Sequence, residues 1–382
     1  MWLLRDPQEL TDYQLILTPA LAQMAVFCDG SRDAAQIQND VSAYFETAVE
    51  SEVIEQMLQQ LDEAYLLDNE RSRRLLEKHL ADYRSLSYRA PALAGNSYPG
   101  DPGRLSNVLS EFGVGDNLDG WASWSGRAIV SPHIDYSRGG RVYSQVWNRA
   151  ANSVKDAELV LIFGTDHNGG PGRINLTRLP YATPWGQIPT DLELVDKLAE
   201  AIGPASFEEE LHHRSEHSVE LSAVWYHFIH GPDPAPMVPI LCGSFHHLIE
   251  SDLSPAADPA IDAFIDTLRT QTAGRRVLVV ASVDLAHVGP QFGDDFIMDQ
   301  ERRTLLQASD RELIEIISSG DAERFYYEVA ANEDRNRICG FSSIYLMLRY
   351  LGPVLGTQIA YEQCPADEAE NSLVSICGLL LK

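Results

Sequence analysis

The chain has 382 residues and is strongly acidic, with 29 lysines and arginines against 56 aspartates and glutamates and a formal net charge of -27. This charge disfavours nucleic acid or an anionic membrane surface as a partner. The sequence contains no run of about 18 apolar residues, so no membrane span is predicted. The N-terminus lacks the basic flank and apolar core of a signal peptide. We therefore expect a soluble, cytoplasmic protein.

Residues 1–88 predict a small helical domain. Helices are expected over 19–27, from Ser31 onward and over 52–63, followed by a short strand or turn at 64–68. Three helices and a small hairpin describe a winged-helix-like module. A DNA-reading winged helix is disfavoured because the segment is acid-rich. A polar helix over 69–83 links this module to the rest of the chain.

Residues 89–382 alternate between apolar strands and amphipathic helices. The expected strands are 127–131, 158–163, 237–242, 276–283, 356–362 and 372–380, and the expected helices are 103–112, 191–202, 258–272, 296–318, 321–330 and 341–351. Such alternation predicts an α/β domain with a layered, mixed or mostly parallel sheet flanked by helices. The last strand is expected to be an antiparallel addition.

Three histidines follow three of these strands. His133 comes after 127–131, His167 after 158–163 and His287 after 276–283. One histidine in this position is as well explained by a structural hydrogen bond. Because ligands of open α/β sheets gather beyond the carboxyl ends of the strands, three of them indicate one shared metal site.

Carboxylates accompany the histidines. Asp284 lies three residues before His287, so one helical turn would put both side chains on one face; the less favoured alternative is that Asp284 is simply a helix N-cap. Glu216 and Glu220 are one helical turn apart, as in metal sites and in ordinary exposed helix starts. Asp166 either orients His167 or caps the following turn.

Other motifs are less specific. The adjacent pairs His212-His213 and His246-His247 predict loop or surface residues, because neighbouring side chains point in different directions. Two glycines in the loop 134–140 suit a close approach of the backbone to a ligand. Cys339 precedes an apolar helix, where a thiolate is stabilised as a ligand or redox group, although a buried inert cysteine is the default.

Cysteine spacing and the absence of several motifs narrow the choice of function. The five cysteines are scattered, and no CxxC pair, HExxH, GxSxG, P-loop or GxGxxG motif occurs. Disulfide frameworks, zinc ribbons, zincin metalloproteases, α/β-hydrolases, NTPases and dinucleotide-binding domains are thereby disfavoured.

Seven short motifs from about residue 90 onward resemble the Memo protein family, in the family's order. They are Ala94-Gly-Asn-Ser-Tyr-Pro-Gly-Asp101, Pro132-His133 with Tyr136, Gly164-Thr-Asp-His167, Glu216-His-Ser-Val-Glu220, Val238-Pro-Ile-Leu-Cys-Gly243, Ser282-Val-Asp-Leu-Ala-His287 and Ile338-Cys-Gly340. The N-terminal segment more weakly resembles PqqD-like peptide-binding modules, through Asp29-Gly30 and Leu61 with Leu66-Leu67.

The Memo resemblance implies a fold similar to LigB-type class III extradiol dioxygenases. It implies that His133, His167 and His287 line a metal cleft, that Cys339 stands where those dioxygenases have a glutamate ligand, and that Asp284 is a further cleft residue. The family is associated with iron or copper and with redox activity. Bacterial and archaeal relatives are linked to an AMMECR1-like protein and a radical SAM enzyme as partners.

The chain departs from the family pattern in two places, and the N-terminal module is extra. Ile134-Asp135 replaces Ala-Gly after the first histidine, and Thr165-Asp166 replaces Pro-Ser before the second. A carboxylate added to the site would favour harder, oxygen-seeking metal ions.

These observations lead to one main hypothesis and two alternatives. The main one is a non-haem, dioxygenase-like oxidoreductase with iron, or else copper or zinc, held by His133, His167, His287 and Cys339. His287, Asp284 and Glu216 are its expected catalytic residues, and its substrate is an unidentified small molecule or peptide. The alternatives are a non-catalytic module that binds a peptide or partner in the same cleft, and a zinc-dependent hydrolase.

Overall fold

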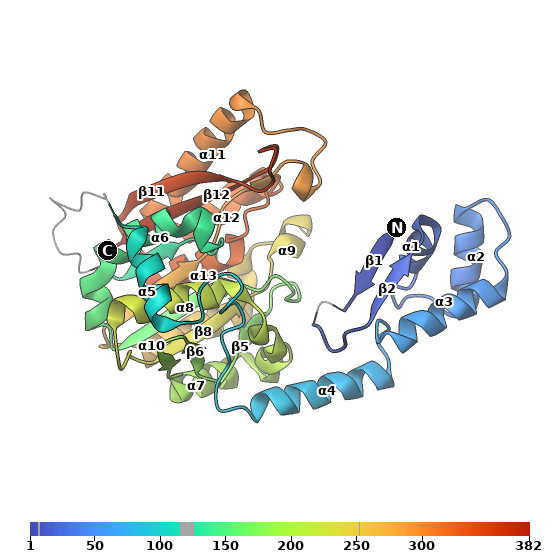
Figure 1. Ribbon diagram of the computed structural model, residues 1–382, viewed down its shortest axis with the longest axis horizontal. Coiled ribbons are helices and arrows are strands. Elements are labelled where there is room, and N and C mark those ends of the chain that lie inside the picture. Colours follow the sequence, from blue (N-terminus) through green and yellow to red (C-terminus); the bar gives the residue numbers. More distant parts are fainter. Residues whose placement is uncertain (7, 115–125, 252) are drawn as a thin grey trace. The chain divides into compact units, whose positions relative to one another are not determined.

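The computed structural model describes residues 1–6, 8–114, 126–251 and 253–382 (Figure 1). The chain forms two compact units, Met1–Ser85 and Leu86–Lys382. No helix in the described part of the chain is both long enough and apolar enough to span a bilayer.

The N-terminal unit packs helices around a small apolar core. Its elements are β1 (Trp2–Arg5), β2 (Gln14–Leu17), α1 (Pro19–Ala25), α2 (Ala34–Tyr44), α3 (Ser51–Glu63) and α4 (Glu70–Arg84). Its buried core consists of Met24, Ile37, Val41, Ile54, Met57 and Leu61. Thr18 caps α1. The second helix was expected from Ser31 onward, but α2 begins after Asp33, because Asp33 and Gln36 form a reciprocal capping box.

The winged-helix arrangement is not confirmed. The antiparallel hairpin β1–β2 precedes the helices, whereas residues 64–68 form turns and bends and no strand. The linking helix is present as α4, with Asn69 as its N-cap.

The second unit is built on an eight-stranded mixed sheet. Its strand order is β10-β12-β3-β9-β4-β8-β5, with β11 paired to β12. The strands are β3 (Ala128–Ser131), β4 (Leu159–Thr165), β5 (Ile174–Leu176), β8 (Met237–Cys242), β9 (Val277–Ser282), β10 (His287–Val288), β11 (Gly356–Pro365) and β12 (Leu373–Leu381). The pairs β3–β9, β9–β4 and β4–β8 are parallel, and β12 joins β3 antiparallel, as expected.

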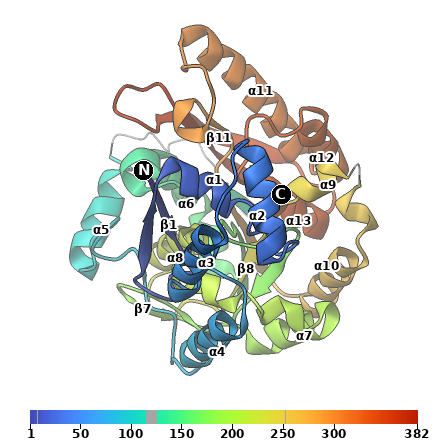
Figure 2. The ribbon, with the colours of Figure 1, turned by 90° about the vertical axis from the view of Figure 1, so that its right-hand side faces the viewer.

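Helices cover both faces of this sheet (Figure 2). They are α5 (Pro102–Glu111), α6 (Tyr136–Asp156), α7 (Leu192–Ile202), α8 (His217–His230), α9 (His246–Glu250), α10 (Pro259–Gln271), α11 (Gln300–Ser319), α12 (Ala322–Ala331) and α13 (Phe341–Leu351). Alternate residues of β4 serve the two layers: Leu161 and Phe163 pack in the core that includes residues of α10 and α13, and Val160 and Ile162 pack in the core that includes residues of α6 and α8. The α/β prediction is therefore confirmed.

Smaller elements complete the unit. β6 (Tyr181–Thr183) and β7 (Gly186–Ile188) form a separate antiparallel hairpin. The 3-10 helices are Pro204–Phe207, Glu210–Arg214, Pro255–Ala257 and Pro290–Phe292.

The loop predicted at 134–140 is wrong, because α6 begins there. Asp135 caps this helix by accepting the N–H of Arg138. A Cβ atom at Gly140 would lie 2.5 Å from the Phe112 ring, and one at Gly139 would lie 2.5 Å from the side chain of Ile134. The two glycines therefore serve the packing of α6 and not the approach of a ligand.

Candidate metal centre

Three histidines meet beyond the carboxyl ends of the parallel strands β3 and β4, which flank β9 in the sheet. His133 follows β3, His167 follows β4, and His217 is the first residue of α8. Their potential ligand atoms all lie within 4.8 Å of one another. The ring centroid of His133 is 5.1 Å from those of both other histidines, and the rings of His167 and His217 stack at 4.6 Å. This spacing is compatible with a single ion between the rings.

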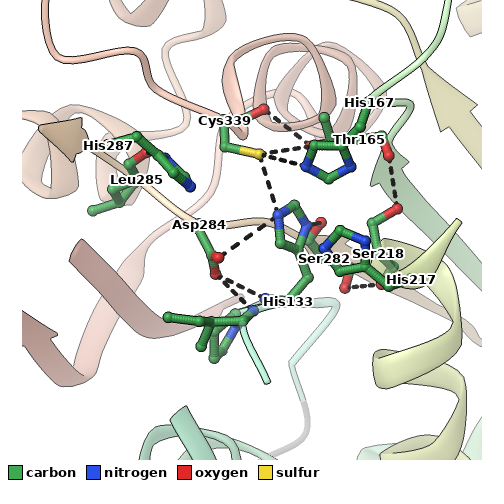
Figure 3. A network of polar contacts seen from close by, with 12 residues as sticks. His133, Thr165, His167, His217, Ser218, Ser282, Asp284, Leu285, His287 and Cys339 are labelled. Carbon is green, nitrogen blue, oxygen red and sulfur yellow. Dashed lines mark hydrogen bonds and ion pairs between the residues drawn. The ribbon is translucent and has the colours of Figure 1, made fainter. Parts of the chain in front are cut away.

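The sulfur of Cys339 faces two of these rings (Figure 3). Its Sγ atom lies 3.2 Å from Nε2 of His133 and 3.4 Å from Nε2 of His167. The residue precedes α13, and its backbone N–H donates to the carbonyl of Leu285, which ties it to the segment after β9. A half-buried sulfur in this place can serve as a thiolate ligand.

Hydrogen bonds determine which ring nitrogen can bind a metal. Nδ1 of His133 lies 2.9 Å from the carbonyl oxygen of Ser282, which can only accept, so Nδ1 carries the proton. Nδ1 of His167 likewise lies 3.0 Å from both carboxylate oxygens of Glu216. In each neutral ring the lone pair is therefore on Nε2, the atom that faces Cys339.

Glu216 orients two of the histidines at once. It caps α8 by accepting the backbone N–H groups of His217 and Ser218, and it accepts that of His167 at 3.0 Å. Nδ1 of His217 is 3.1 Å from its Oε1 atom. Burial raises the pKa of Glu216, but the hydrogen bonds and charges of His167 and His217 outweigh it and hold the pKa well below its ordinary value. Glu216 therefore acts on the site as a carboxylate that supports the metal-facing rings.

Asp284 holds the first histidine through its backbone. Its Oδ1 atom accepts the N–H groups of His133 and Ile134 at 2.9 and 3.1 Å, and its Oδ2 atom is 3.7 Å from Nε2 of His133. This carboxylate is buried and lies beside the cluster, so it both fixes the loop and adds negative charge to the site.

The cluster favours charge separation when no metal is bound. Burial raises the pKa of Cys339, but the charges and hydrogen bonds of His133 and His167 lower it well below 9.0. Burial lowers the pKa of both histidines, but the thiolate and nearby carboxylates raise it to about 9 for His133 and about 11 for His167. A metal ion must therefore displace protons from these rings.

His287 lines the same cavity but lies outside the three-histidine group. The cavity has a volume of about 500 Å³ and is also lined by His133, His167, His217 and Asp284. Nδ1 of His287 is 3.2 Å from the carbonyl of Leu285, and its ring meets Phe292 edge-on at 5.1 Å. In the part of the chain that the structure describes, His217 joins the histidine group in the place expected for His287.

Glu220, unlike Glu216, makes structural contacts away from the histidines. Its carboxylate pairs with the buried Arg89 and accepts from Tyr98 and from the backbone N–H groups of Ala92 and Leu93. It therefore anchors the segment that leads into the domain.

The prediction that His212-His213 lies at the surface is wrong, because both rings have buried partners. Nδ1 of His212 lies 3.0 Å from a carboxylate oxygen of Asp166, and His213 bonds to the hydroxyl of Tyr181 at 2.7 Å. Asp166 and His212 form a second group with Glu209 whose atoms lie within 4.8 Å of one another. Burial lowers the pKa of His213 to about 3.

Neither carboxylate that departs from the family pattern belongs to the three-histidine group. Asp166 pairs with His212, and Asp135 pairs with Arg138 at 2.6 Å. Asp135 nevertheless lines the same cavity as the three histidines, so the preference for harder metal ions stays a prediction. His246, of the other adjacent pair, is exposed, and His247 is half-buried.

Comparison with known proteins agrees with the motifs. The family model described as Memo-like protein matches residues 89–379. A MEMO1 family protein of Aquifex aeolicus is 26% identical over 398 residues, covering 99% of this chain and 95% of the relative. MEMO1 family proteins of Archaeoglobus fulgidus and Methanopyrus kandleri are 29% and 28% identical, covering 69% and 74% of this chain and 86% and 89% of their own lengths. The chain belongs to the Memo-like protein family.

Proposed function

We propose that this chain binds one transition-metal ion through His133, His167, His217 and Cys339, and that it is an iron-dependent, dioxygenase-like oxidoreductase. The observations that carry the proposal are the convergence of three imidazoles beyond the strand ends and the position of one sulfur beside two of them. Imidazole and thiolate donors suit iron, copper and zinc and do not suit magnesium or calcium. Iron is placed first because the motif resemblance implies iron or copper.

Other residues of the site would orient the ligands and accept a proton. A bound redox metal would supply one-electron chemistry toward oxygen and an organic substrate. Glu216 keeps the rings of His167 and His217 oriented, and Asp284 keeps His133 in place. His287 presents Nε2 as a general base, because its Nδ1 is engaged by the carbonyl of Leu285.

The cavity is suited to a small organic substrate. Its volume is about 500 Å³, and its walls combine the histidines with the apolar side chains of Leu93, Ile134, Leu221, Phe292 and Val374. A concave site of this size, in which apolar side chains adjoin convergent polar and charged groups, is suited to a small molecule that carries polar groups of its own.

Metal analysis after anaerobic purification tests the proposal. Wild-type protein from iron-replete cells is expected to carry about one iron per chain, and H167A and H217A are expected to lose it. H230A is the matched control, because His230 lies at the opposite end of α8 from His217. Absence of any transition metal from the wild type would refute the proposal and favour the alternative of a peptide- or partner-binding module.

The identity of the metal distinguishes the oxidoreductase hypothesis from the zinc-hydrolase hypothesis. Iron with oxygen consumption supports the oxidoreductase. Stoichiometric zinc without oxygen consumption would overturn it in favour of the zinc hydrolase. The AMMECR1-like protein and the radical SAM enzyme are proposed partners, and co-purification with each tests them.

A further inference from the structure

A second cavity lies at the opposite ends of the strands that lead to the histidines. It has a volume of about 470 Å³, and its lining includes four arginines: Arg127, Arg269, Arg275 and Arg276. Arg127 directly precedes β3, and Arg276 directly precedes β9. Four arginines around one cavity stand out in a chain with 29 basic and 56 acidic residues.

Two of these arginines are paired with carboxylates. Nη2 of Arg275 lies 2.8 Å from Asp191, and Nη2 of Arg276 lies 3.2 Å from Glu158. These pairs orient the two side chains at the rim of the cavity. They also neutralise much of their charge.

The other two arginines contact carbonyl oxygens. Arg269 donates from Nε to the carbonyl of Tyr350 at 3.1 Å and from Nη2 to that of Arg349, and Arg127 donates to the carbonyl of Leu351 at 3.3 Å. Within the described residues, neither forms an ion pair with a carboxylate. Their contacts cap the C-terminal end of α13 and use part of each guanidinium, which has five N–H groups.

A buried hydroxyl lies among these positive charges. Tyr350 bonds to the Oγ1 atom of Thr272 at 2.8 Å, and both residues line the cavity. Burial raises the pKa of Tyr350, while the charges of Arg127, Arg269 and Arg275 act against that rise. Arg127, Arg269 and Arg275 line the same cavity as this hydroxyl.

We propose that this cavity binds a small, multiply charged oxyanion through Arg127 and Arg269. Guanidinium groups bind phosphate and carboxylate oxygens through bidentate hydrogen bonds. Two guanidinium groups at one site favour a ligand with more than one negative charge. The volume is suited to a small molecule. None of the three histidines takes part in this site, so the proposal does not depend on the proposed metal centre.

Calorimetric titration of the full-length protein tests this site with two probes. Inorganic pyrophosphate represents phosphate ligands, and citrate represents polycarboxylates; tighter binding of one identifies the source of the oxyanion. Wild-type protein is expected to bind at least one probe, and R127Q/R269Q is expected to bind it about tenfold more weakly or worse, because each lost charged hydrogen bond contributes of the order of a tenfold change.

The control distinguishes this cavity from chelation at the metal centre. R311Q/R324Q removes the same charge from exposed positions on α11 and α12. This control variant is expected to bind the probe as tightly as the wild type does. If the probe instead chelated a metal ion held by the histidines, its affinity would be equal in all three proteins. Absence of binding in the wild type, or equal affinity in R127Q/R269Q, would overturn the proposal.

A milder variant covers the case in which the double variant fails to fold. R127K keeps the charge at an exposed position but loses the planar fork. It is expected to keep the wild-type melting temperature and to bind the probe several-fold more weakly. Wild-type affinity in R127K would then count against the site.

Discussion

The carboxylate of Glu216 holds His167 at two points, since its oxygens lie 3.0 Å from the backbone nitrogen and 3.0 Å from Nδ1 of the ring. The same carboxylate caps α8, which begins with His217. One side chain thus sets the position of a loop after β4, the start of a helix and the tautomer of a ligand. This relationship links helix capping to the proposed metal site.

E216Q is therefore expected to weaken metal binding by about 10- to 100-fold, which is the usual effect of losing a carboxylate behind a metal-bound histidine. Glutamine keeps an oxygen for the helix cap, so the loss of folding stability is expected to stay within about 1 kcal/mol. Competition with a chromogenic chelator measures the affinity. E208Q, at an exposed glutamate, is the control. Equal affinities in E216Q and wild type would show that this carboxylate does not support the ligands.

Cys339 is expected to be ionised at neutral pH in the metal-free protein. Its pKa is held well below 9.0 by His133 and His167, whereas burial raises the pKa of Cys364 to about 12. Alkylation of Cys339 by iodoacetamide, followed by mass spectrometry, is therefore expected to change little between pH 6 and pH 8. An ordinary thiol would react roughly a hundredfold faster at the higher pH, in proportion to its thiolate fraction.

Two substitutions check the origin of this thiolate. H133N and H167N each remove one imidazole, so the alkylation rate of Cys339 is expected to become pH-dependent in both. Cys364 serves as the internal control, since its thiol is expected to remain unreactive over this range. A strongly pH-dependent rate in the wild type would contradict the charge-separated cluster.

Acid is expected to destabilise the fold through His213. Its pKa is about 3 in the folded protein, below 6.5 for a free imidazole, so the unfolded chain binds more protons between these values. The stabilising contribution is complete above pH 6.5 and is lost as the pH falls toward 3. Urea unfolding at pH 7 and pH 5 should therefore show a smaller acid-induced loss in H213N than in wild type. An identical loss in both proteins would rule out His213 as the cause.

Much of the α/β unit follows from local sequence patterns. The apolar segments at β3, β4, β8 and β9 are buried on both faces, which is typical of central parallel strands and explains why they could be predicted. The same pattern predicts that His133, His167 and His287 come together, because the carboxyl ends of parallel strands lie at one edge of a sheet, and all three line one cavity.

The parts that could not be predicted depend on contacts between distant segments. α6 begins in a stretch with two glycines, which are disfavoured in helices; they are accommodated here by the close packing of Gly139 against Ile134 and of Gly140 against Phe112. His217 is not among the ligands predicted from the sequence, although it lies within the motif Glu216-His-Ser-Val-Glu220. Its role depends on α8 meeting the end of β4, which no local pattern reveals. The burial of His212 likewise depends on Asp166, 46 residues away in sequence.

The contrast between His217 and His287 provides the sharpest test of the site. His217 belongs to the histidine group, whereas His287 lines the cavity beside it. H287Q is therefore expected to retain the full metal content while losing most of the proposed oxidoreductase activity, because it removes the proposed base and none of the proposed ligands. H217Q is expected to lose both. Metal analysis and oxygen consumption on the same preparations measure the two effects. Loss of the metal from H287Q, with retention in H217Q, would restore His287 as the ligand and assign His217 to the cavity wall.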